Sequence, residues 1–221
     1  MKYVVLCVYS TVFGVYLSCI FVIFTGKIKI KWKTKSTQVF KILLMTRGFV
    51  IWLTGLPCSG KTTIGKNLFD FFKTRGYKVE LIDGDIIRQY ISKGLGFSRE
   101  DRFENIRRVS FLANILSRNG VIAIVAVISP YREMRKMARD MVETDFIEVF
   151  VNAPVDVCKQ RDVKGMYKKA EKGEIKGFTG VDDPYEPPEN PDVECRTDVE
   201  SVEQSVRKII DLLRERNLIS V

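Results

Sequence analysis

Residues 49–62 read FVIWLTGLPCSGKT, and this stretch decides the fold. The apolar run at 49–54 predicts a buried strand. It leads into GLPCSGKT at 55–62, which matches the pattern G-x-x-x-x-G-K-[ST], and an amphipathic stretch at about 60–74 predicts a helix directly after it. A strand before this pattern and a helix after it are the context in which it binds phosphate. The stretch therefore predicts a strand–loop–helix unit with a phosphate-binding loop.

The residue types in the loop indicate ATP with Mg²⁺ as its ligand. Gly55 and Gly60 let the backbone turn its N–H groups toward phosphate, and the helix adds its positive end. Lys61 supplies positive charge to the β- and γ-phosphates, and Thr62 offers a hydroxyl to Mg²⁺. Cys58 fits the turn as a small residue, with a redox role as the weaker alternative. The predicted nucleotide-binding residues of the loop are Gly55, Leu56, Pro57, Cys58, Ser59, Gly60, Lys61, Thr62 and Thr63.

Apolar runs and amphipathic stretches alternate from Gly48 onward. Further strands are predicted at 78–82, 121–128 and 146–151, and further helices at about 86–93, 99–118, 131–143, 154–162 and 199–216. This alternation predicts an α/β three-layer sandwich with a parallel sheet, the P-loop NTPase fold. The segment 163–198 is rich in Lys, Gly, Pro and acidic residues and predicts a lid or long functional loop.

Residues 1–46 form a separate apolar and basic segment. Residues 3–26 carry no charge and have the length of a membrane-spanning helix, and KIKIKWKTK follows them. Under the positive-inside rule the rest of the chain would then lie in the cytoplasm, tethered by this helix. A second interpretation stays open, in which a wrongly chosen upstream start codon adds a stretch foreign to the natural protein. Met45 would then lie near the true start.

Composition excludes several classes of function. The chain has no histidine, so histidine triads and histidine metal sites are absent. Its five cysteines show no CxxC pair and are typical of free thiols. Of the net charge of +9, residues 1–47 hold eight positive side chains and no acidic one, which leaves +1 for 48–221. The globular part is thus nearly neutral, and nucleic acid is not a predicted partner.

A second candidate cluster is LIDGDIIR at 81–88. Asp83 and Asp85 follow a predicted strand, at the edge where open α/β sheets bind ligands. One carboxylate would hold Mg²⁺ through water, and the other would accept a hydroxyl proton. The residues alone predict equally well a turn that only starts a helix.

The remaining motifs identify a family. GFSREDRFENIRR at 96–108, VISPYR at 127–132, DVKGMYKKAEKGEIKGFTG at 162–180 and DDPYEPP at 182–188 follow the phosphate loop and DGDIIR. In this order and spacing they resemble adenylylsulfate kinase over about residues 47–217. The resemblance implies a kinase domain at 47–221 that transfers the ATP γ-phosphoryl group to the 3′-hydroxyl of adenylyl sulfate. The products would be 3′-phosphoadenylyl sulfate and ADP, and the family often forms homodimers.

The resemblance also implies roles for individual residues. Asp85, Lys61, Ser129 and Lys164 would be catalytic, Thr62 and Asp83 would hold the metal, and Arg161 and Thr197 would lie near the ATP adenine. Phe97 and Phe178 would stack on the substrate adenine, and Arg88, Arg102 and Asn105 would hold its phosphosulfate group. The full set of substrate contacts is Asp83, Asp85, Ile86, Ile87, Arg88, Phe97, Arg102, Asn105, Ile128, Ser129, Lys164, Gly177 and Phe178.

Three departures and two alternatives accompany this assignment. Ile86, Val127 and Asn152 stand where the family often has Asn, Phe and Asp, which affects expected affinity rather than reaction type. One alternative is a kinase for another small alcohol such as a sugar acid. The other is a membrane-tethered module that binds nucleotides without turnover.

Overall fold

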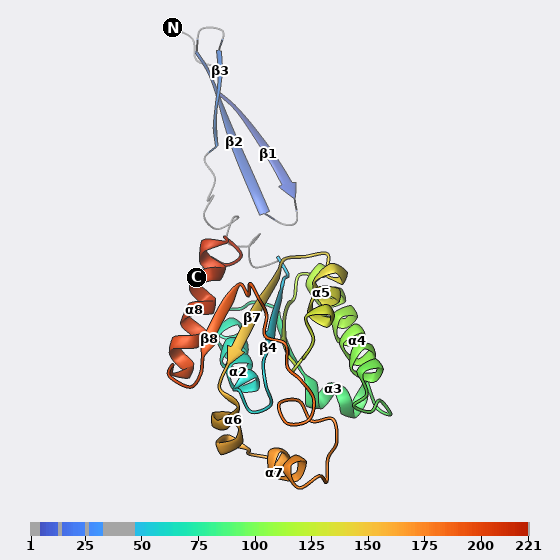
Figure 1. The fold of residues 1–221 in the computed structure, drawn as a ribbon. Coiled ribbons are helices and arrows are strands. Elements are labelled where there is room, and N and C mark those ends of the chain that lie inside the picture. Colours follow the sequence, from blue (N-terminus) through green and yellow to red (C-terminus); the bar gives the residue numbers. More distant parts are fainter. Residues whose placement is uncertain (1–4, 13–14, 25–26, 33–46, 221) are drawn as a thin grey trace. The chain divides into compact units, whose positions relative to one another are not determined.

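The computed structural model describes residues 5–12, 15–24, 27–32 and 47–220, with side chains from Arg47 onward. The chain divides into two compact units, Met1–Leu44 and Met45–Val221. Each unit contains its own sheet, one of three strands and one of five strands (Figure 1).

The N-terminal unit contains antiparallel strands instead of the helix predicted over 3–26. Strands β1 (Val5–Val12), β2 (Val15–Phe24) and β3 (Lys27–Trp32) pair in the order β1-β2-β3. Length and hydropathy suggested the helix, but Val, Ile, Tyr and Phe dominate this segment and favour strands. The predicted basic linker beyond residue 32 lies outside the described residues as far as residue 46.

None of the helices within the described parts of the chain is both long and apolar enough to cross a membrane.

The second unit is built on a parallel sheet. In the order β5-β6-β4-β7-β8, its strands are Val79–Asp83, Ile122–Ala126, Val50–Thr54, Phe146–Asn152 and Val193–Arg196. Every neighbouring pair is parallel. The four predicted strands are confirmed, with bounds shifted by one or two residues. The carboxyl ends of these parallel strands meet at one edge of the sheet, where α/β folds bind ligands.

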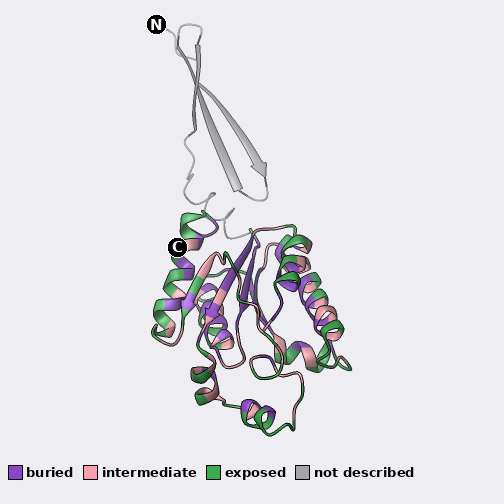
Figure 2. Ribbon diagram, viewed as in Figure 1, coloured by how far each residue is buried: buried purple, intermediate pink, exposed green. Residues whose placement is uncertain are grey.

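Helices cover both faces of this sheet, which confirms the predicted three layers (Figure 1). Helices α2 (Lys61–Lys73) and α8 (Val202–Glu215) contact each other and cover one face. Helices α4 (Arg99–Arg118) and α5 (Arg132–Met141) cover the other. Two apolar clusters fill the spaces between the layers. The central strands β6, β4 and β7 are accordingly the most buried, while the outer sides of the helices are exposed (Figure 2).

Three short helices lie near the carboxyl edge of the sheet: α3 (Gly84–Tyr90), α6 (Val155–Arg161) and α7 (Met166–Glu171). The segment 163–198, predicted as a lid or loop, contains α7 and ends in β8. Cys195 of β8 is fully buried in the core cluster beside α8. Strand β8, with the sequence VECR, was not predicted. It is short, lies at the sheet edge and buries only one of its four residues fully.

Candidate active site

The loop between β4 and α2 has the conformation expected of a phosphate-binding loop. Its backbone takes positive φ values at Gly55 (152°), Cys58 (60°) and Gly60 (106°). A side chain at position 55 would bring its Cβ to 2.3 Å from the carbonyl oxygen of Val151, so the position requires glycine. Gly60 caps α2, whose first N–H groups have no helical partner and favour an anion.

Lys61 is the cation of this loop. It is 8% exposed, and its Nζ donates to the carbonyl oxygens of Gly55 at 2.9 Å and Leu56 at 2.6 Å. Burial lowers the pKa of Lys61 from 10.5 to about 8, with partial compensation by Cys158, Cys58, Asp85 and Asp83. The carbonyls satisfy the ammonium hydrogens but bring no negative charge. A phosphate beside Lys61 would supply that charge.

Asp83 connects the phosphate loop to the start of α3, in the Asp83-Gly84-Asp85 sequence that we call the DGD cluster. It is the N-cap of α3, and its Oδ1 accepts a hydrogen bond from the backbone N of Asp85 at 2.9 Å. Its Oδ2 accepts from the hydroxyl of Thr62 at 2.8 Å. The side chain of Asp85 is instead 68% exposed and pairs with Lys164 from the segment before α7. This partner raises the pKa of Lys164.

The donor set suits a magnesium ion. Within residues 47–220 no group of three Cys, Asp or Glu side chains is arranged to hold a metal by itself. Thr62 and Asp83 nevertheless present adjacent oxygens at the phosphate loop. Mg²⁺ is commonly held by one or two protein oxygens together with nucleotide phosphates and water. These two residues therefore fit the ion.

The predicted substrate side of the site lies across the same cavity. The guanidinium of Arg88 lies 4.5 Å from the ring centre of Phe97 and donates to the carbonyl oxygen of Gly96 at 2.9 Å. Burial lowers the pKa of Arg88. Asn105 is 6% exposed, and its Oδ1 is a buried acceptor without a protein partner in the described residues. Such an orphaned oxygen favours a ligand or water at this position.

Arg102 and Ser129 are more deeply engaged with the protein than the sequence predicts. Arg102 donates to the carbonyl oxygen of Phe97, to the hydroxyl of Thr179 and to the carbonyl oxygen of Gly177. Ser129 is 2% exposed and has a φ of 41°. Its Oγ accepts from Trp52 Nε1 at 3.1 Å and donates to the hydroxyl of Thr54 at 3.0 Å.

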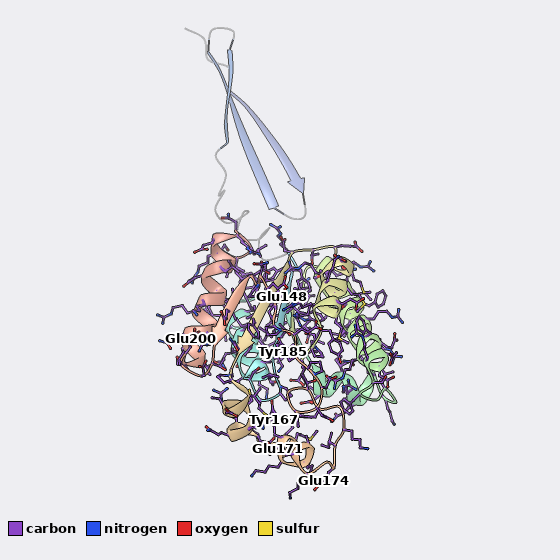
Figure 3. All side chains as sticks on the ribbon, in the orientation of Figure 1. Glu148, Tyr167, Glu171, Glu174, Tyr185 and Glu200 are labelled. Carbon is purple, nitrogen blue, oxygen red and sulfur yellow. The ribbon has the colours of Figure 1, made fainter. Side chains whose placement is uncertain are left out.

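Residues that follow β7, from Arg161 to Thr197, form the remaining part of the cavity wall. Arg161, at the end of α6, donates to the carbonyl oxygen of Thr197 at 2.5 Å, and the hydroxyl of Thr197 donates to the carbonyl oxygen of Ser59 at 2.7 Å. Tyr167 lies on α7 (Figure 3). It is 1% exposed and donates to the carbonyl oxygen of Pro57 at 3.2 Å. Its ring meets that of Phe178 edge-on at 5.0 Å. The phosphate loop and the predicted stacking residue are thus linked through α7.

These elements enclose a cavity of about 650 Å³. The predicted site residues that line it are Pro57, Cys58, Gly60, Lys61, Thr62, Thr63, Asp83, Asp85, Arg88, Phe97, Arg102, Asn105, Ile128, Ser129, Arg161, Lys164, Gly177, Phe178 and Thr197. Those that lie outside its lining are Gly55, Leu56, Ser59, Ile86 and Ile87. Ile86 is 55% exposed, and Ile87 belongs to the core cluster under α4. The departure from the family pattern at Ile86 therefore falls outside the cavity wall.

Several residues that line the cavity were not predicted from the sequence: Val163, Met166, Ile175, Thr179, Glu200 and Val202. Most belong to the segment around α7 or the turn before α8, where no periodic pattern assigns a direction to a side chain. The bond from Thr179 to Arg102 spans 77 positions, so only the folded chain reveals it.

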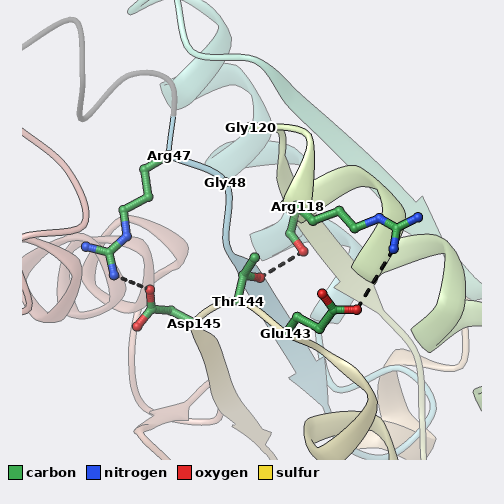
Figure 4. A pocket seen from close by; sticks show the side chains of 8 residues that line it. Arg47, Gly48, Arg118, Gly120, Glu143, Thr144 and Asp145 are labelled. Atoms are coloured by element: carbon green, nitrogen blue, oxygen red, sulfur yellow. Dashed lines mark hydrogen bonds and ion pairs between the residues drawn. The ribbon is translucent and has the colours of Figure 1, made fainter.

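A separate hollow of about 550 Å³ lies at the amino-terminal ends of β4 and β7, away from the phosphate loop (Figure 4). Arg47 pairs there with Asp145 at 2.5 Å, and Arg118 with Glu143 at 3.9 Å. All four side chains are substantially exposed, so both ion pairs are weak. Nothing in this hollow resembles a catalytic arrangement.

Comparison with known proteins gives a consistent result. Residues 47–196 match the family model described as adenylylsulphate kinase. The adenylyl-sulfate kinase of a Picosynechococcus species is 55% identical over 174 residues, which span 79% of this chain and 98% of the relative. That of Rippkaea orientalis is 59% identical over 169 residues, or 76% of this chain and 93% of the relative.

A solved structure agrees with these sequences. The APS kinase CysC of Mycobacterium tuberculosis, in complex with AMPPNP and APS, is 40% identical and superimposes with a TM-score of 0.74. The match covers 76% of this chain and 98% of that one. The extent of these matches and the site geometry together lead to one assignment: the chain belongs to the adenylylsulfate kinase family.

Proposed function

We propose that this protein transfers the γ-phosphoryl group of ATP to the 3′-hydroxyl of adenylyl sulfate, giving 3′-phosphoadenylyl sulfate and ADP. The observation that carries the proposal is the single cavity that joins the phosphate loop to Arg88, Phe97 and Phe178. A donor with three phosphates suits one side, where the helix α2 begins. A planar base next to an anionic group suits the other, where aromatic rings lie beside a guanidinium.

Asp85 and Lys61 would divide the chemistry between acceptor and donor. Asp85 orients the 3′-hydroxyl and accepts its proton as the oxygen attacks the γ-phosphorus. Lys61 stabilises the charge on the transferring oxygens. When bound, Mg²⁺ would neutralise phosphate charge from a position next to Thr62 and Asp83.

Lys164 would act as a mobile cation. Its contact with Asp85 puts its ammonium at the cavity, close to the group that must receive the hydroxyl proton. A nucleotide phosphate would compete for this ammonium and release the carboxylate of Asp85. Closure of 163–180 would then exclude water and limit ATP hydrolysis.

The substrate contact near Ser129 would come from its backbone and that of Ile128. The Ser129 hydroxyl is bonded to Thr54 and Trp52, and the side chain is buried. A phosphoserine intermediate would need that hydroxyl to leave both partners. In-line transfer between two bound nucleotides needs no such intermediate.

The direct test is ADP release from ATP with adenylyl sulfate, set against a panel of sugars and sugar acids as acceptors. Turnover with adenylyl sulfate and none with the panel supports the proposal, and Lys61→Met provides an inactive control. Preferred turnover of another alcohol would instead support the alternative function, a kinase for that alcohol. Protection by both nucleotides against proteolysis, without ADP release, would favour the binding module.

A homodimer is proposed for the assembled protein from the family pattern, and its sedimentation coefficient tests this. The association of residues 1–46 with a membrane stays a sequence-based prediction. The mass of the native protein and its partition between membrane and supernatant fractions test that prediction. A mass equal to that of a chain starting near Met45 would instead support the upstream-start interpretation.

A further inference from the structure

A buried polar cluster outside the predicted catalytic set joins three parts of the acceptor side. It consists of Arg102 from α4, Tyr131 after β6, and Thr179 and Asp183 from the segment that follows α7; we refer to these four residues as the acceptor cluster. The hydroxyl of Tyr131 donates to Asp183 Oδ1 at 2.7 Å. The hydroxyl of Thr179 accepts from Arg102 at 2.7 Å and donates to Asp183 Oδ2 at 3.3 Å.

Burial makes the charge of Asp183 important. Arg102 is 6% exposed, Tyr131 6% and Thr179 1%, and the side chain of Asp183 is 17% exposed, so water screens the cluster only in part. Arg102 Nη2 lies 3.6 Å from Asp183 Oδ2. The other acceptors that Arg102 uses are neutral carbonyl and hydroxyl oxygens. Asp183 thus supplies negative charge within ion-pair distance of a buried cation, which would otherwise be costly to keep in place.

Arg102 in turn fixes the backbone beside both predicted stacking rings. Its Nε donates to the carbonyl oxygen of Phe97 at 2.9 Å, and its Nη2 donates to that of Gly177, immediately before Phe178. The neighbouring Asp182 completes the second anchor by accepting from the backbone N of Gly177 at 2.7 Å and of Phe178 at 2.5 Å. One guanidinium therefore holds the backbone beside both aromatic rings.

Asp183 itself does not line the main cavity, whereas Arg102, Thr179 and Phe178 do. We infer that Asp183 is a positioning residue for the acceptor nucleotide, which acts by holding Arg102 and Thr179 so that Phe97 and Phe178 face each other across the base. The inference rests on the proposed function, because it assigns the rings to adenylyl sulfate. It predicts an effect on acceptor binding with little effect on ATP.

The test is Asp183→Asn, which preserves the size of the side chain and removes its charge. We expect KM for adenylyl sulfate to rise about tenfold, because Arg102 and the Tyr131 hydroxyl lose the negative charge that they face. KM for MgATP should stay within about twofold, because the phosphate loop has its own contacts. The matched control is Asp140→Asn on α5, which removes an exposed carboxylate bonded to Lys136 at 2.6 Å and should change neither constant.

Tyr131→Phe is the second variant, because it removes one hydrogen bond to Asp183 and leaves all charges in place. A smaller rise in the same constant is expected, about threefold to fivefold. Melting temperatures establish that each variant is folded, and calorimetric titration with adenylyl sulfate in the presence of an ATP analogue repeats the comparison at equilibrium.

The possible outcomes separate the inference from the proposed function. Equal rises in both KM values, or a fall in kcat alone, would mean a general structural role and overturn the inference. Unchanged constants in folded Asp183→Asn would overturn it as well. If the unaltered protein does not phosphorylate adenylyl sulfate, the proposed function fails; equal calorimetric affinity of the unaltered protein and Asp183→Asn for adenylyl sulfate overturns the inference whether or not turnover occurs.

Discussion

Raising the pH above 8 should weaken ATP binding through one identified group, Lys61. Burial places its pKa at about 8 instead of 10.5, so in the free protein the ammonium form predominates at neutral pH and is lost as the pH rises through 8. At about 1.36 kcal/mol per unit, the shift corresponds to roughly 3 kcal/mol of unfavourable burial of the charge. A bound triphosphate supplies the missing counter-charge and should raise the pKa again.

The direction of the pH dependence follows from the protonation state of Lys61 that binds phosphate, which is the ammonium form. Below pH 8 Lys61 is already protonated, so kcat/KM for MgATP should be flat there. Above pH 8 the neutral amine predominates, and kcat/KM should fall about tenfold per pH unit, since this constant reports the free enzyme. At pH 8 about half of the molecules must take up a proton to bind ATP, so uptake should reach about 0.5 proton per site.

The assay is calorimetric titration of a non-hydrolysable ATP analogue in buffers of different ionisation enthalpy, from pH 6.5 to 9.5, beside the kinetic profile. The chain has no histidine to obscure the lower part of this range. Lys61→Arg is the control, because its guanidinium stays protonated throughout and should abolish the uptake even if turnover is low. Flat profiles and no proton uptake at pH 8 would refute the assigned pKa and its cause.

Three further substitutions test separate parts of the site. Asp85→Asn should lower kcat about 100-fold or more while an ATP analogue still binds, because it removes the proton acceptor and leaves the phosphate loop intact; retained turnover would contradict its role. Phe178→Ala should raise KM for adenylyl sulfate about tenfold with little change for ATP, measured by steady-state kinetics, since it deletes a predicted stacking surface. Ser129→Ala should cost about 1–2 kcal/mol of stability in denaturant titrations, through its lost bonds to Trp52 and Thr54, yet retain turnover. Its inactivity in a folded protein would instead support a covalent role.

The donor half of the site is predictable because its contacts are local. Residues 55–62 are contiguous, and the longest bond that Lys61 makes within them spans six positions, to Gly55. Strand β4, the loop and α2 each have a strong sequence signal, so the motif specifies both the local backbone and its chemistry. The DGD cluster follows the same logic, since Asp83 ends β5 and caps α3.

For the acceptor half, the sequence predicts which residues take part but not which of them contact one another. Sequence motifs indicated Arg102 and Phe178, but the bond of Arg102 to Thr179 spans 77 positions and that of Tyr131 to Asp183 spans 52. No local pattern encodes such pairs. The family resemblance also assigned Ile86 and Ile87 to the substrate; Ile86 lies on the surface and Ile87 in the core, and neither side chain lines the cavity.

The N-terminal prediction failed for a different reason. An uncharged run of about 20 residues is compatible with a helix by length, but length does not distinguish a helix from strands rich in β-branched residues. Strand β8 was missed because it has only four residues and lies at the sheet edge.

This division between local and distant contacts bears on how the site responds to stress. The phosphate loop lies between a fully buried strand and a helix packed in the core, so it should open only when that core opens. The segment 177–183 is held at the cavity edge by side-chain bonds to Arg102 and Tyr131. Segments with few buried apolar contacts open at lower free energy than the core. Mild denaturant should therefore remove acceptor binding before ATP binding, because the structures that recognise the two nucleotides differ in how they are attached to the sheet.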